Sequence, residues 1–539
     1  MGKKFKRGLW YKKDGVTLFT DDGDENVEII LEKTEEYRRA TIRAKTDIEP
    51  IFYRKPSIYV ADEEETMFFN GYQSWTDSRE SYVNEYEKDV KKIPKFLLKK
   101  FAFDRYGDSW FYESGENILH GYDVFYSRGT NEVFYFNGLI GQHLLLFEVD
   151  KPTGELCIAS DLEGVKLKAG EEMEVLKYYR AYSFQKGLEL FNKIYPKKDV
   201  KKIFGYTSWY KLYQNINEQV LLSDLDALDE RFNLFQIDDG YQTFVGDWLD
   251  VDTKKFPNGL KPLVEKAHET GKMAGLWLAP LVAETKSKLF NEHPEYFAKV
   301  DGEFACCGSN WSGFYALDIY NEDARAYIKK CLTHYADMGF DFFKLDFLYA
   351  ATMCKKEGKT RGMVTEDAYA FLRECLGDKL ILGCGAIIFN AIGKFDYMRV
   401  GPDVSLKFDD VWYMRAVHRE RISTKVTIQN TIYRSFMDKH LFGNDPDVFL
   451  LRDKNISLSK AQKKALLTIN ALFGSVLMTS DNIAEYGDEA KAELDEALRL
   501  WNEATVLKYS RDGARIDIEY MLDGEKKKIV YDTIRGVIL

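Results

Sequence analysis

Between residues 203 and 503 the chain alternates short apolar runs with amphipathic stretches, and this alternation constrains its fold most strongly. The apolar runs have the length of buried strands, and the stretches between them carry the 3.6-residue spacing of helices. Eight such units predict a (β/α)8 barrel, because each parallel strand needs a crossover before the next can pair with it. The expected strands are residues 203–206, 234–237, 273–278, 342–345, 380–383, 397–400, 441–443 and 476–479. The expected helices are residues 217–230, 259–270, 321–338, 365–376, 418–437, 458–471 and 487–503, with a shorter connection after Cys384.

The segments on either side of this region follow another pattern. From the N-terminus to Pro196, short alternating runs such as residues 28–31 and 132–136 predict an antiparallel β-sandwich. From Ala504 onward the alternation returns around two Asp-Gly turns, which predicts a small C-terminal antiparallel β-domain. The expected fold class is therefore multidomain α/β plus β, with domains at 1–198, 199–503 and 504–539.

Charge and composition exclude several classes of partner. A net charge of -11 without an extended Lys/Arg block argues against nucleic acid and anionic membranes. The seven cysteines form no CxxC pair, which indicates reduced thiols and a cytoplasmic protein. No apolar stretch follows the first residues, Met-Gly-Lys-Lys-Phe-Lys-Arg, so we expect no secretory signal. The seven histidines show neither HxH nor HExxH, so we expect no metal and no other cofactor.

The residues that end the predicted strands share one chemistry. In a barrel the site lies at the carboxyl ends of the strands. Aromatic side chains there can take the apolar face of a sugar ring, and charged groups can hold its hydroxyls. The strand ends carry Trp209, Asp238, Asp239, Trp277, Lys344, Asp346, Cys384 and Arg399, with Asp403 and the segment Asn444-Asp-Pro-Asp447 in the loops that follow. We therefore predict a small carbohydrate as the partner; homo-oligomer formation is left open.

Two of these carboxylates can do glycosidic chemistry. Asp346 is our expected nucleophile, because the charge of Lys344, two residues earlier on the same strand face, favours its ionised form. Asp403 is the expected acid/base, placed by the loop after Gly401-Pro402. The alternatives are a structural Lys344–Asp346 ion pair, and a turn or N-cap role for Asp403 after proline. Asp238 and Asp239 are neighbours on one strand and are better suited to clamping hydroxyls.

One loop of the N-terminal region stands apart. Residues 68–75, Phe-Phe-Asn-Gly-Tyr-Gln-Ser-Trp, place aromatic and amide side chains where a polar turn is expected. Such a loop is typical of a ligand wall, and it is equally typical of a staple between domains.

These motifs together resemble glycoside hydrolase family 36, a family of retaining α-galactosidases. In chain order they are Asn70-Gly-Tyr-Gln-Ser-Trp75, Ser208-Trp-Tyr210, Phe235-Gln-Ile-Asp-Asp-Gly-Tyr241, Gly246-Asp-Trp248, Gly275-Leu-Trp-Leu-Ala-Pro280, Phe343-Lys-Leu-Asp-Phe347, Leu382-Gly-Cys-Gly385, Met398-Arg-Val-Gly-Pro-Asp403 and Asn444-Asp-Pro-Asp447. The loop motif departs from some relatives, since it has Tyr72 in place of a second Trp.

The resemblance implies an N-terminal β-supersandwich, a (β/α)8 catalytic domain and a C-terminal β-domain. It also implies Asp346 as nucleophile and Asp403 as acid/base. The galactose subsite that it implies is lined by Trp209, Asp238, Asp239, Trp277, Lys344, Cys384 and Arg399, with Trp75 reaching in from the first domain.

The expected function is a retaining glycoside hydrolase that releases terminal α-linked galactose through a covalent galactosyl-Asp intermediate. An α-N-acetylgalactosaminidase with the same mechanism is the alternative and would need room at C2, where Cys384 and Gly385 are the expected walls. A non-catalytic sugar-binding protein is disfavoured by the paired carboxylates. A metal-dependent barrel is disfavoured because the strand ends lack clustered His and Glu ligands.

Overall fold

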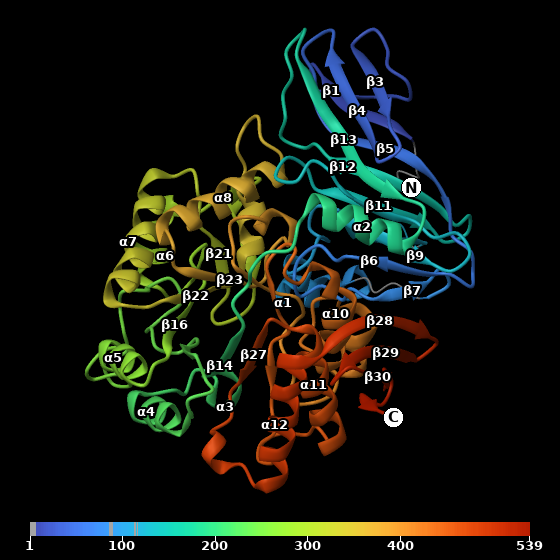
Figure 1. The fold of residues 1–539 in the computed structure, drawn as a ribbon. Helices are drawn as coiled ribbons and strands as arrows, with labels where there is room; N and C mark the ends of the chain where they lie inside the picture. The colour runs from blue at the N-terminus through green and yellow to red at the C-terminus, as the bar shows by residue number, and fades with distance from the viewer. Residues whose placement is uncertain (1–6, 86–89, 113–114, 116) are drawn as a thin grey trace.

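The computed structural model describes residues 7–85, 90–112, 115 and 117–539, and it confirms the predicted fold class (Figure 1). Residues 1–6, on which the expectation of no secretory signal partly rests, lie outside the described residues. Two antiparallel sheets come first, a parallel sheet of nine strands that forms the barrel follows, and an antiparallel sheet ends the chain. The domain boundaries at 198 and 503 stay predictions.

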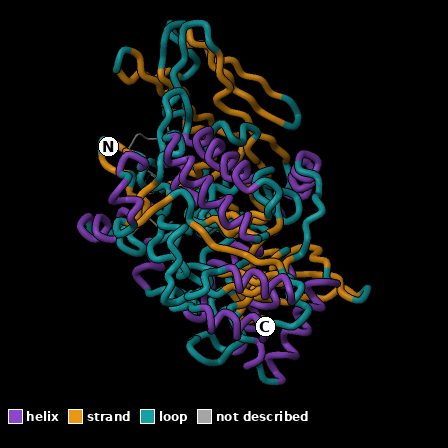
Figure 2. The backbone as a smooth tube through the Cα atoms, turned by 90° about the vertical axis from the view of Figure 1, so that its left-hand side faces the viewer, coloured by secondary structure: helices purple, strands orange, loops and turns teal. Residues whose placement is uncertain are grey.

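The N-terminal region is built from two sheets that face each other across an apolar core. Among the described residues one sheet has six strands in the order β2-β1-β5-β12-β11-β8, and the other has seven in the order β3-β4-β13-β10-β9-β6-β7. Leu9, Tyr11, Phe125 and Phe147 are fully buried in the core between them. The strands are β1 Gly8–Lys13, β2 Val16–Thr20, β3 Val27–Lys33, β4 Tyr37–Ala44, β5 Glu49–Val60, β6 Thr66–Phe69, β7 Glu80–Tyr82, β8 Ile118–Tyr122, β9 Val124–Arg128, β10 Phe134–Asn137, β11 Leu145–Asp150, β12 Glu155–Asp161 and β13 Glu172–Ala181. Their long hairpins project at the top of Figure 2.

Short helices complete this region. Helix α1 Lys95–Phe101 and the 3-10 turns η1 Val90–Lys92 and η2 Phe103–Arg105 lie between β7 and β8 in the chain. Helix α2 Phe184–Ile194 leads toward the barrel, and the Ser183 hydroxyl caps its first turn by accepting from the Lys186 amide.

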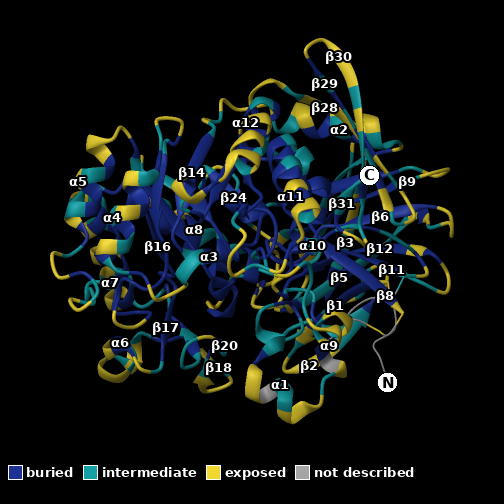
Figure 3. Cartoon of the chain, turned by 90° about the horizontal axis from the view of Figure 1, so that it is seen from below, coloured by how far each residue is buried: buried dark blue, intermediate teal, exposed yellow. Residues whose placement is uncertain are grey.

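The barrel consists of parallel strands whose buried runs match the sequence pattern. Within residues 203–479, all of which the structure describes, the order is β25-β24-β23-β22-β16-β15-β14-β27-β26. Its strands are β14 Ile203–Thr207, β15 Leu234–Ile237, β16 Met273–Leu278, β22 Phe342–Leu345, β23 Leu380–Gly383, β24 Tyr397–Arg399, β25 Gly443–Asp445, β26 Val448–Phe449 and β27 Val476–Thr479. Figure 3 shows β14, β16 and β24 of this sheet in the colour of buried residues.

The seventh strand differs from its prediction. An apolar run at 441–443 predicts a strand there, but β25 begins at Gly443 and is interrupted at Pro446 before β26 resumes. Proline has no amide hydrogen to donate, so the ladder breaks at this point. β25 pairs with β24 and β26 pairs with β27, so the two short pieces together close the barrel.

Helices follow most strands and cover the outside of the barrel. They are α3 Trp209–Leu212, α4 Glu218–Ala227, α5 Lys261–Glu269, α7 Glu322–Met338, α8 Arg361–Leu376, η5 Phe389–Ala391, α9 Trp412–Val417, α10 Thr424–Tyr433, η6 Ser435–Met437, α11 Lys460–Phe473, η7 Ile483–Glu485 and α12 Asp488–Glu503. A longer excursion after β16 holds β17 Val282–Glu284, α6 Lys288–Glu292, η3 Pro294–Tyr296, β18 Lys299–Val300, β19 Glu303–Phe304, β20 Cys306–Gly308 and β21 Phe314–Ala316. The turn η4 Leu348–Met353 follows β22.

The C-terminal sheet packs on the N-terminal region as well as on the barrel. It has four strands within the described residues 505–538: β28 Thr505–Asp512, β29 Arg515–Leu522, β30 Glu525–Asp532 and β31 Val537–Ile538. Arg128 of β9 lies with its guanidinium carbon 4.5 Å from the centre of the Tyr509 ring, and Tyr509 also meets Tyr126 hydroxyl to hydroxyl at 3.3 Å. Among the described residues, no helix is both long and apolar enough to cross a membrane.

A buried carboxylate in the N-terminal region makes stability depend on pH. Burial raises the pKa of Asp123 to about 7, against hydrogen bonds from Asn137 and the Leu145 amide. In the unfolded chain its pKa is about 3.9. Between these values the folded protein keeps a proton that the unfolded chain releases, so stability falls as pH rises from about 4 to 7 and then levels off.

We predict that Asp123→Asn removes this part of the pH dependence. Asp123 has φ 65°, a left-handed conformation that asparagine tolerates well, and the amide has the shape of the protonated acid. The melting temperature of the wild type should fall more between pH 5 and pH 8 than that of the variant. Equal falls in the two proteins would show that Asp123 is ionised in the folded state.

Candidate active site

Asp346 lies directly after β22, at the carboxyl end of a fully buried strand. Its Oδ2 accepts a hydrogen bond of 3.0 Å from the indole nitrogen of Trp277, and its Oδ1 accepts one of 2.8 Å from the Phe347 amide. Trp277 pairs with Lys344 in the register of β16 and β22, which places its indole beside the strand end. Phe347 has φ 54°, a strained conformation for a non-glycine residue. Both carboxylate oxygens are thus held by fixed donors.

The pKa of Asp346 shifts in the direction opposite to the sequence-based expectation. Burial raises it, the charge of Lys344 lowers it, and the charge of Asp403 raises it again; the net shift is upward. Lys344 does not pair directly with Asp346. Its ammonium lies 2.8 Å from Oδ2 of Asp238, across the barrel interior, and both side chains are almost completely buried. The structure therefore shows a Lys344–Asp238 pair where the alternative interpretation had a structural Lys344–Asp346 pair.

The two adjacent carboxylates follow the end of β15 at Ile237 and face different groups. The Oδ2 atom of Asp238 accepts hydrogen bonds of 2.8 Å from the side-chain amide of Gln236 and from the ammonium of Lys344. Asp239 turns the other way, where its Oδ2 accepts from the side-chain amide of Gln214 at 2.8 Å and from the indole of Trp311 at 3.0 Å. Burial raises the pKa of Asp239, against these hydrogen bonds and one from Gln242.

Arg399, the last residue of β24, holds three carboxylates at once. Its guanidinium nitrogens lie 2.9 Å from Oδ1 of Asp403, 3.0 Å from Oδ2 of Asp445 and 2.8 Å from Oδ1 of Asp447. Asp445 and Asp447 are buried, whereas the side chain of Asp403 is 29% exposed. Of the three carboxylates, Asp403 is therefore the one that solvent or a ligand can reach.

Asp447 fixes the start of the loop that carries Asp403. One oxygen of its carboxylate accepts from the Tyr210 hydroxyl and, at 2.7 Å, from the amide of Val404, the residue after Asp403. Burial raises the pKa of Asp447 to about 7, although Arg399 lowers it. The sequence pattern placed the Asn444-Asp-Pro-Asp447 segment at the mouth but indicated no role for Asp447.

Trp75 crosses from the N-terminal region to the barrel mouth. Its indole nitrogen lies 3.3 Å from the sulfur of Cys384, the residue after β23, and its ring meets Phe347 edge to face at 5.1 Å. Gly385 permits this approach, since it has φ 56° and a Cβ there would lie 2.9 Å from the Trp75 ring. In the same loop Tyr72 donates to Thr352 at 2.7 Å, so the loop joins the two regions as well as lining the mouth.

Two aromatic residues of the mouth have neighbours that the sequence did not indicate. The ring of Trp209 packs edge to face on Tyr213, which is not among the predicted site residues, with the ring centres 5.1 Å apart. Trp311, which sequence reasoning missed, packs on Trp277 at 6.3 Å and on Phe347 at 5.1 Å. The turn Asn310-Trp-Ser-Gly313 places an aromatic side chain in a polar turn, the same signal that singled out Trp75.

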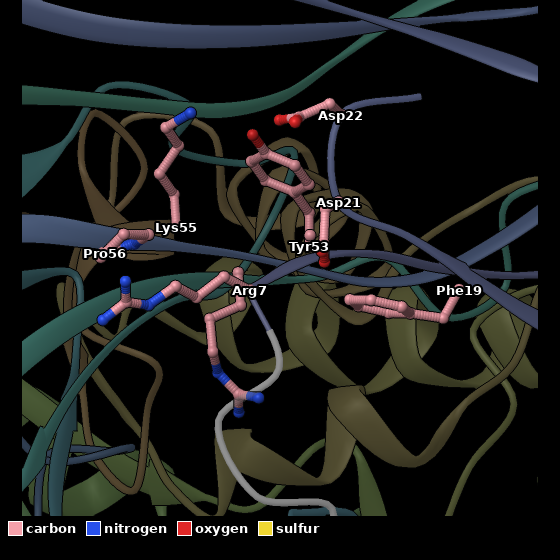
Figure 4. A pocket seen from close by; sticks show the side chains of 9 residues that line it. Arg7, Phe19, Asp21, Asp22, Tyr53, Lys55 and Pro56 are labelled. Carbon is pink, nitrogen blue, oxygen red and sulfur yellow. The ribbon is translucent and has the colours of Figure 1, made fainter. Parts of the chain in front are cut away.

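A separate cavity of about 490 Å³ lies on the sheet of β1 and β5, outside the barrel (Figure 4). Two of its cations already have partners: Arg7 pairs with Glu155, and Arg54 binds Glu148 through two nitrogens. Within the described residues, no group of three His, Cys, Asp or Glu side chains is arranged to hold a metal ion.

We predict that the Lys344–Asp238 pair can be measured in the stability of the barrel. Lys344→Met leaves the Asp238 charge buried without its cation, which should lower the free energy of unfolding by about 3–5 kcal/mol. Adding Asp238→Asn should recover most of this loss in urea unfolding followed by tryptophan fluorescence. Adding Asp346→Asn instead is the matched control, and an equal recovery there would contradict the pairing.

Comparison with known proteins agrees with these motifs. The model of the melibiase family matches residues 193–392. Alpha-galactosidase Mel36A of Lactobacillus acidophilus is 28% identical over 200 residues, which are 34% of this chain and 27% of that protein. The A type blood alpha-D-galactosamine galactosaminidase of Flavonifractor plautii is 35% identical over 131 residues, 22% of this chain and 12% of that protein. The matched regions thus span about a quarter or less of these relatives.

A solved structure resembles nearly the whole chain. TtGalA, an α-galactosidase from Thermus thermophilus in complex with p-nitrophenyl α-D-galactopyranoside, superposes with a TM-score of 0.73 at 24% identity. The match covers 95% of this chain and 97% of that one, and it shows a shared fold. Family model, sequence relatives and fold together confirm the resemblance to the α-galactosidases of glycoside hydrolase family 36 that the motifs indicate.

Proposed function

We propose that this protein is a retaining glycosidase that releases terminal α-linked galactose from small oligosaccharides. The observation that carries the proposal is one mouth that holds Asp346, fixed by Trp277 and the Phe347 amide, and Asp403, held by Arg399 and exposed. Asp346 and Asp403 follow β22 and β24, which lie on either side of β23 in the barrel. Burial raises the pKa of Asp346, and the charge of Asp403 adds to this shift. Relatives named α-galactosidases support the substrate class.

In the proposed reaction Asp346 attacks the anomeric carbon while Asp403 gives a proton to the leaving oxygen. The glycosidic bond breaks, and a β-linked galactosyl ester forms on Asp346. Asp403, now ionised, then takes a proton from water, and the water oxygen attacks the anomeric carbon. Galactose leaves with its α configuration, and both carboxylates return to their starting states. The attack requires ionised Asp346; burial raises its pKa, and the charge of Lys344 and the hydrogen bond from Trp277 act against this shift.

The same residues bear on the choice between galactose and N-acetylgalactosamine. Cys384 and Gly385 are the proposed walls beside C2, and the Trp75 ring packs directly behind both. This packing supports a hydroxyl over the bulkier acetamide. Because one relative is named a galactosaminidase, an N-acetylgalactosaminide remains the alternative substrate. The cytoplasmic location stays a prediction, with which the free thiols of all seven cysteines are in agreement.

We predict that the wild type hydrolyses an aryl α-galactoside and that Asp346→Asn reduces kcat by more than about a thousandfold, because an amide does not attack the anomeric carbon. The variant should melt close to the wild type and still bind galactose in calorimetry. Loss of stability together with loss of binding would instead assign Asp346 a structural role. Faster release from the aryl α-N-acetylgalactosaminide would favour the alternative substrate.

We predict that Asp403→Ala slows a disaccharide far more than an activated aryl α-galactoside, whose leaving oxygen needs little protonation. With the aryl substrate the second step lacks its base, so the galactosyl-enzyme should accumulate and added azide should restore turnover. Azide displaces the β-linked ester from the opposite face, so nuclear magnetic resonance should identify α-galactosyl azide. Equal slowing of both substrates, without rescue, would reduce Asp403 to a turn residue.

A further inference from the structure

A strained, exposed aromatic residue stands at the barrel mouth outside every role assigned above. Tyr213 follows the short helix α3, which leads away from the end of β14. Its backbone has φ 51° and ψ −132°, a region that glycine occupies readily and other residues avoid at a cost of about 1–3 kcal/mol. Its side chain is 42% exposed. Such a conformation persists where the surrounding structure fixes it.

The backbone at Tyr213 is held from several sides. Its amide donates to the carbonyl of Trp209 at 2.7 Å. The next residue, Gln214, gives its side-chain amide to Asp239 and receives Lys255 on its carbonyl at 2.8 Å. Gly240 allows the segment to lie close, since a Cβ there would be 2.7 Å from the Cα of Gln214. These contacts hold the strained backbone of Tyr213 in place, with its aromatic ring exposed.

The surroundings of this ring are those of the candidate acid/base. Trp209 lies behind it, half-buried, with the two ring planes at 87°. Burial raises the pKa of Tyr213, and the charges of Arg452 and Asp403 act on it in opposite directions. Tyr210, in the same short helix α3, donates to the Asp447 carboxylate, which also accepts from the amide of Val404, so the segment before Tyr213 is joined to the loop that carries Asp403. Figure 3 shows α3 with intermediate exposure next to the buried barrel strands.

We propose that Tyr213, backed by Trp209, forms the wall of a subsite that receives the leaving sugar ring of the substrate. This inference rests on the proposed function, in which Asp403 protonates the leaving oxygen. The leaving ring must then lie beside Asp403, on the open side of the mouth. An exposed aromatic face is what the apolar side of a sugar ring packs against, and a ring held in advance loses little freedom on binding.

The test compares two substrates that both need acid assistance and differ in the leaving ring. An α-galactosyl-glucose disaccharide has one, and methyl α-galactoside has none. The measured quantity is the ratio of kcat/KM for the disaccharide to kcat/KM for the methyl glycoside. In Tyr213→Ala this ratio should fall roughly 5- to 20-fold, as expected for the loss of one stacking partner. Tyr213→Phe keeps the ring and should keep the ratio within about threefold.

Two further variants separate binding from folding. Tyr213→Gly relieves the strained φ, so it should melt no lower than Tyr213→Ala while losing the same ratio. Tyr182→Ala is the matched control, a tyrosine 49% exposed after β13 in the N-terminal region, and its ratio should equal that of the wild type.

An unchanged ratio in both Tyr213→Ala and Tyr213→Gly would overturn the subsite and leave the proposed function standing, provided the wild type hydrolyses methyl α-galactoside. A wild type that hydrolyses neither substrate would overturn both. A fall in Tyr213→Phe as large as in Tyr213→Ala would assign the effect to the hydroxyl and contradict stacking.

Discussion

The mouth of the barrel depends on the ion pairs that the Arg399 guanidinium forms with three carboxylates. This guanidinium joins the end of β24 to the interrupted seventh strand through Asp445 and Asp447, and it reaches Asp403 on the loop beyond. Three carboxylates around one cation leave excess negative charge in a buried place. Burial raises the pKa of Asp447 to about 7, and the neighbouring charges of Asp403 and Asp445 add to this shift while Arg399 opposes it. Since Asp447 also binds the amide after Asp403, strand closure and the position of the candidate acid/base are parts of one network.

A second buried cation connects the N-terminal region to this network. Arg434, after α10, is fully buried, and burial lowers its pKa to about 9. Its guanidinium donates to the carbonyls of Ser74 at 2.6 Å and Val400 at 2.7 Å, and to the side chain of Asn70 at 2.9 Å. Ser74 precedes Trp75, and Val400 follows Arg399. The loop that brings Trp75 to Cys384 is thus tied to the strand end that carries the acid/base candidate. The two interpretations of the loop at residues 68–75, a ligand wall and a staple between domains, are therefore compatible with each other.

The periodic part of the fold could be predicted from the sequence, because buried parallel strands and amphipathic helices have different spacings. The runs at 342–345, 380–383 and 476–479 coincide with β22, β23 and β27. The seventh strand was predicted in the wrong place. The prediction followed the apolar run at 441–443, whereas the paired strand begins at Gly443 and is interrupted at Pro446. Strand-end residues such as Asp346 and Arg399 could be named because parallel strands end at one edge. The partners of these residues could not be predicted. Lys344 pairs with Asp238 and not with Asp346, and this contact across the barrel joins residues far apart in the sequence. Trp311 was missed because its excursion between β20 and β21 has no strand or helix period.

Backbone strain also occurs at the mouth, where four of the eleven described non-glycine residues with positive φ lie. Tyr213, Trp311, Phe347 and Asp447 all have positive φ, although none is glycine, and each lies beside a candidate catalytic or binding group. Each such residue costs about 1–3 kcal/mol, which only a structure that fixes the backbone from several sides can hold. The sequence keeps bulky side chains at these four turns, where glycine would relieve the backbone. Each side chain has a contact there that glycine would lose: Tyr213 on Trp209, Trp311 on Asp239, Phe347 on Trp75 and Asp447 on Arg399. The strain therefore accompanies groups that face the mouth, which is the pattern expected when a site is held ready before its ligand arrives.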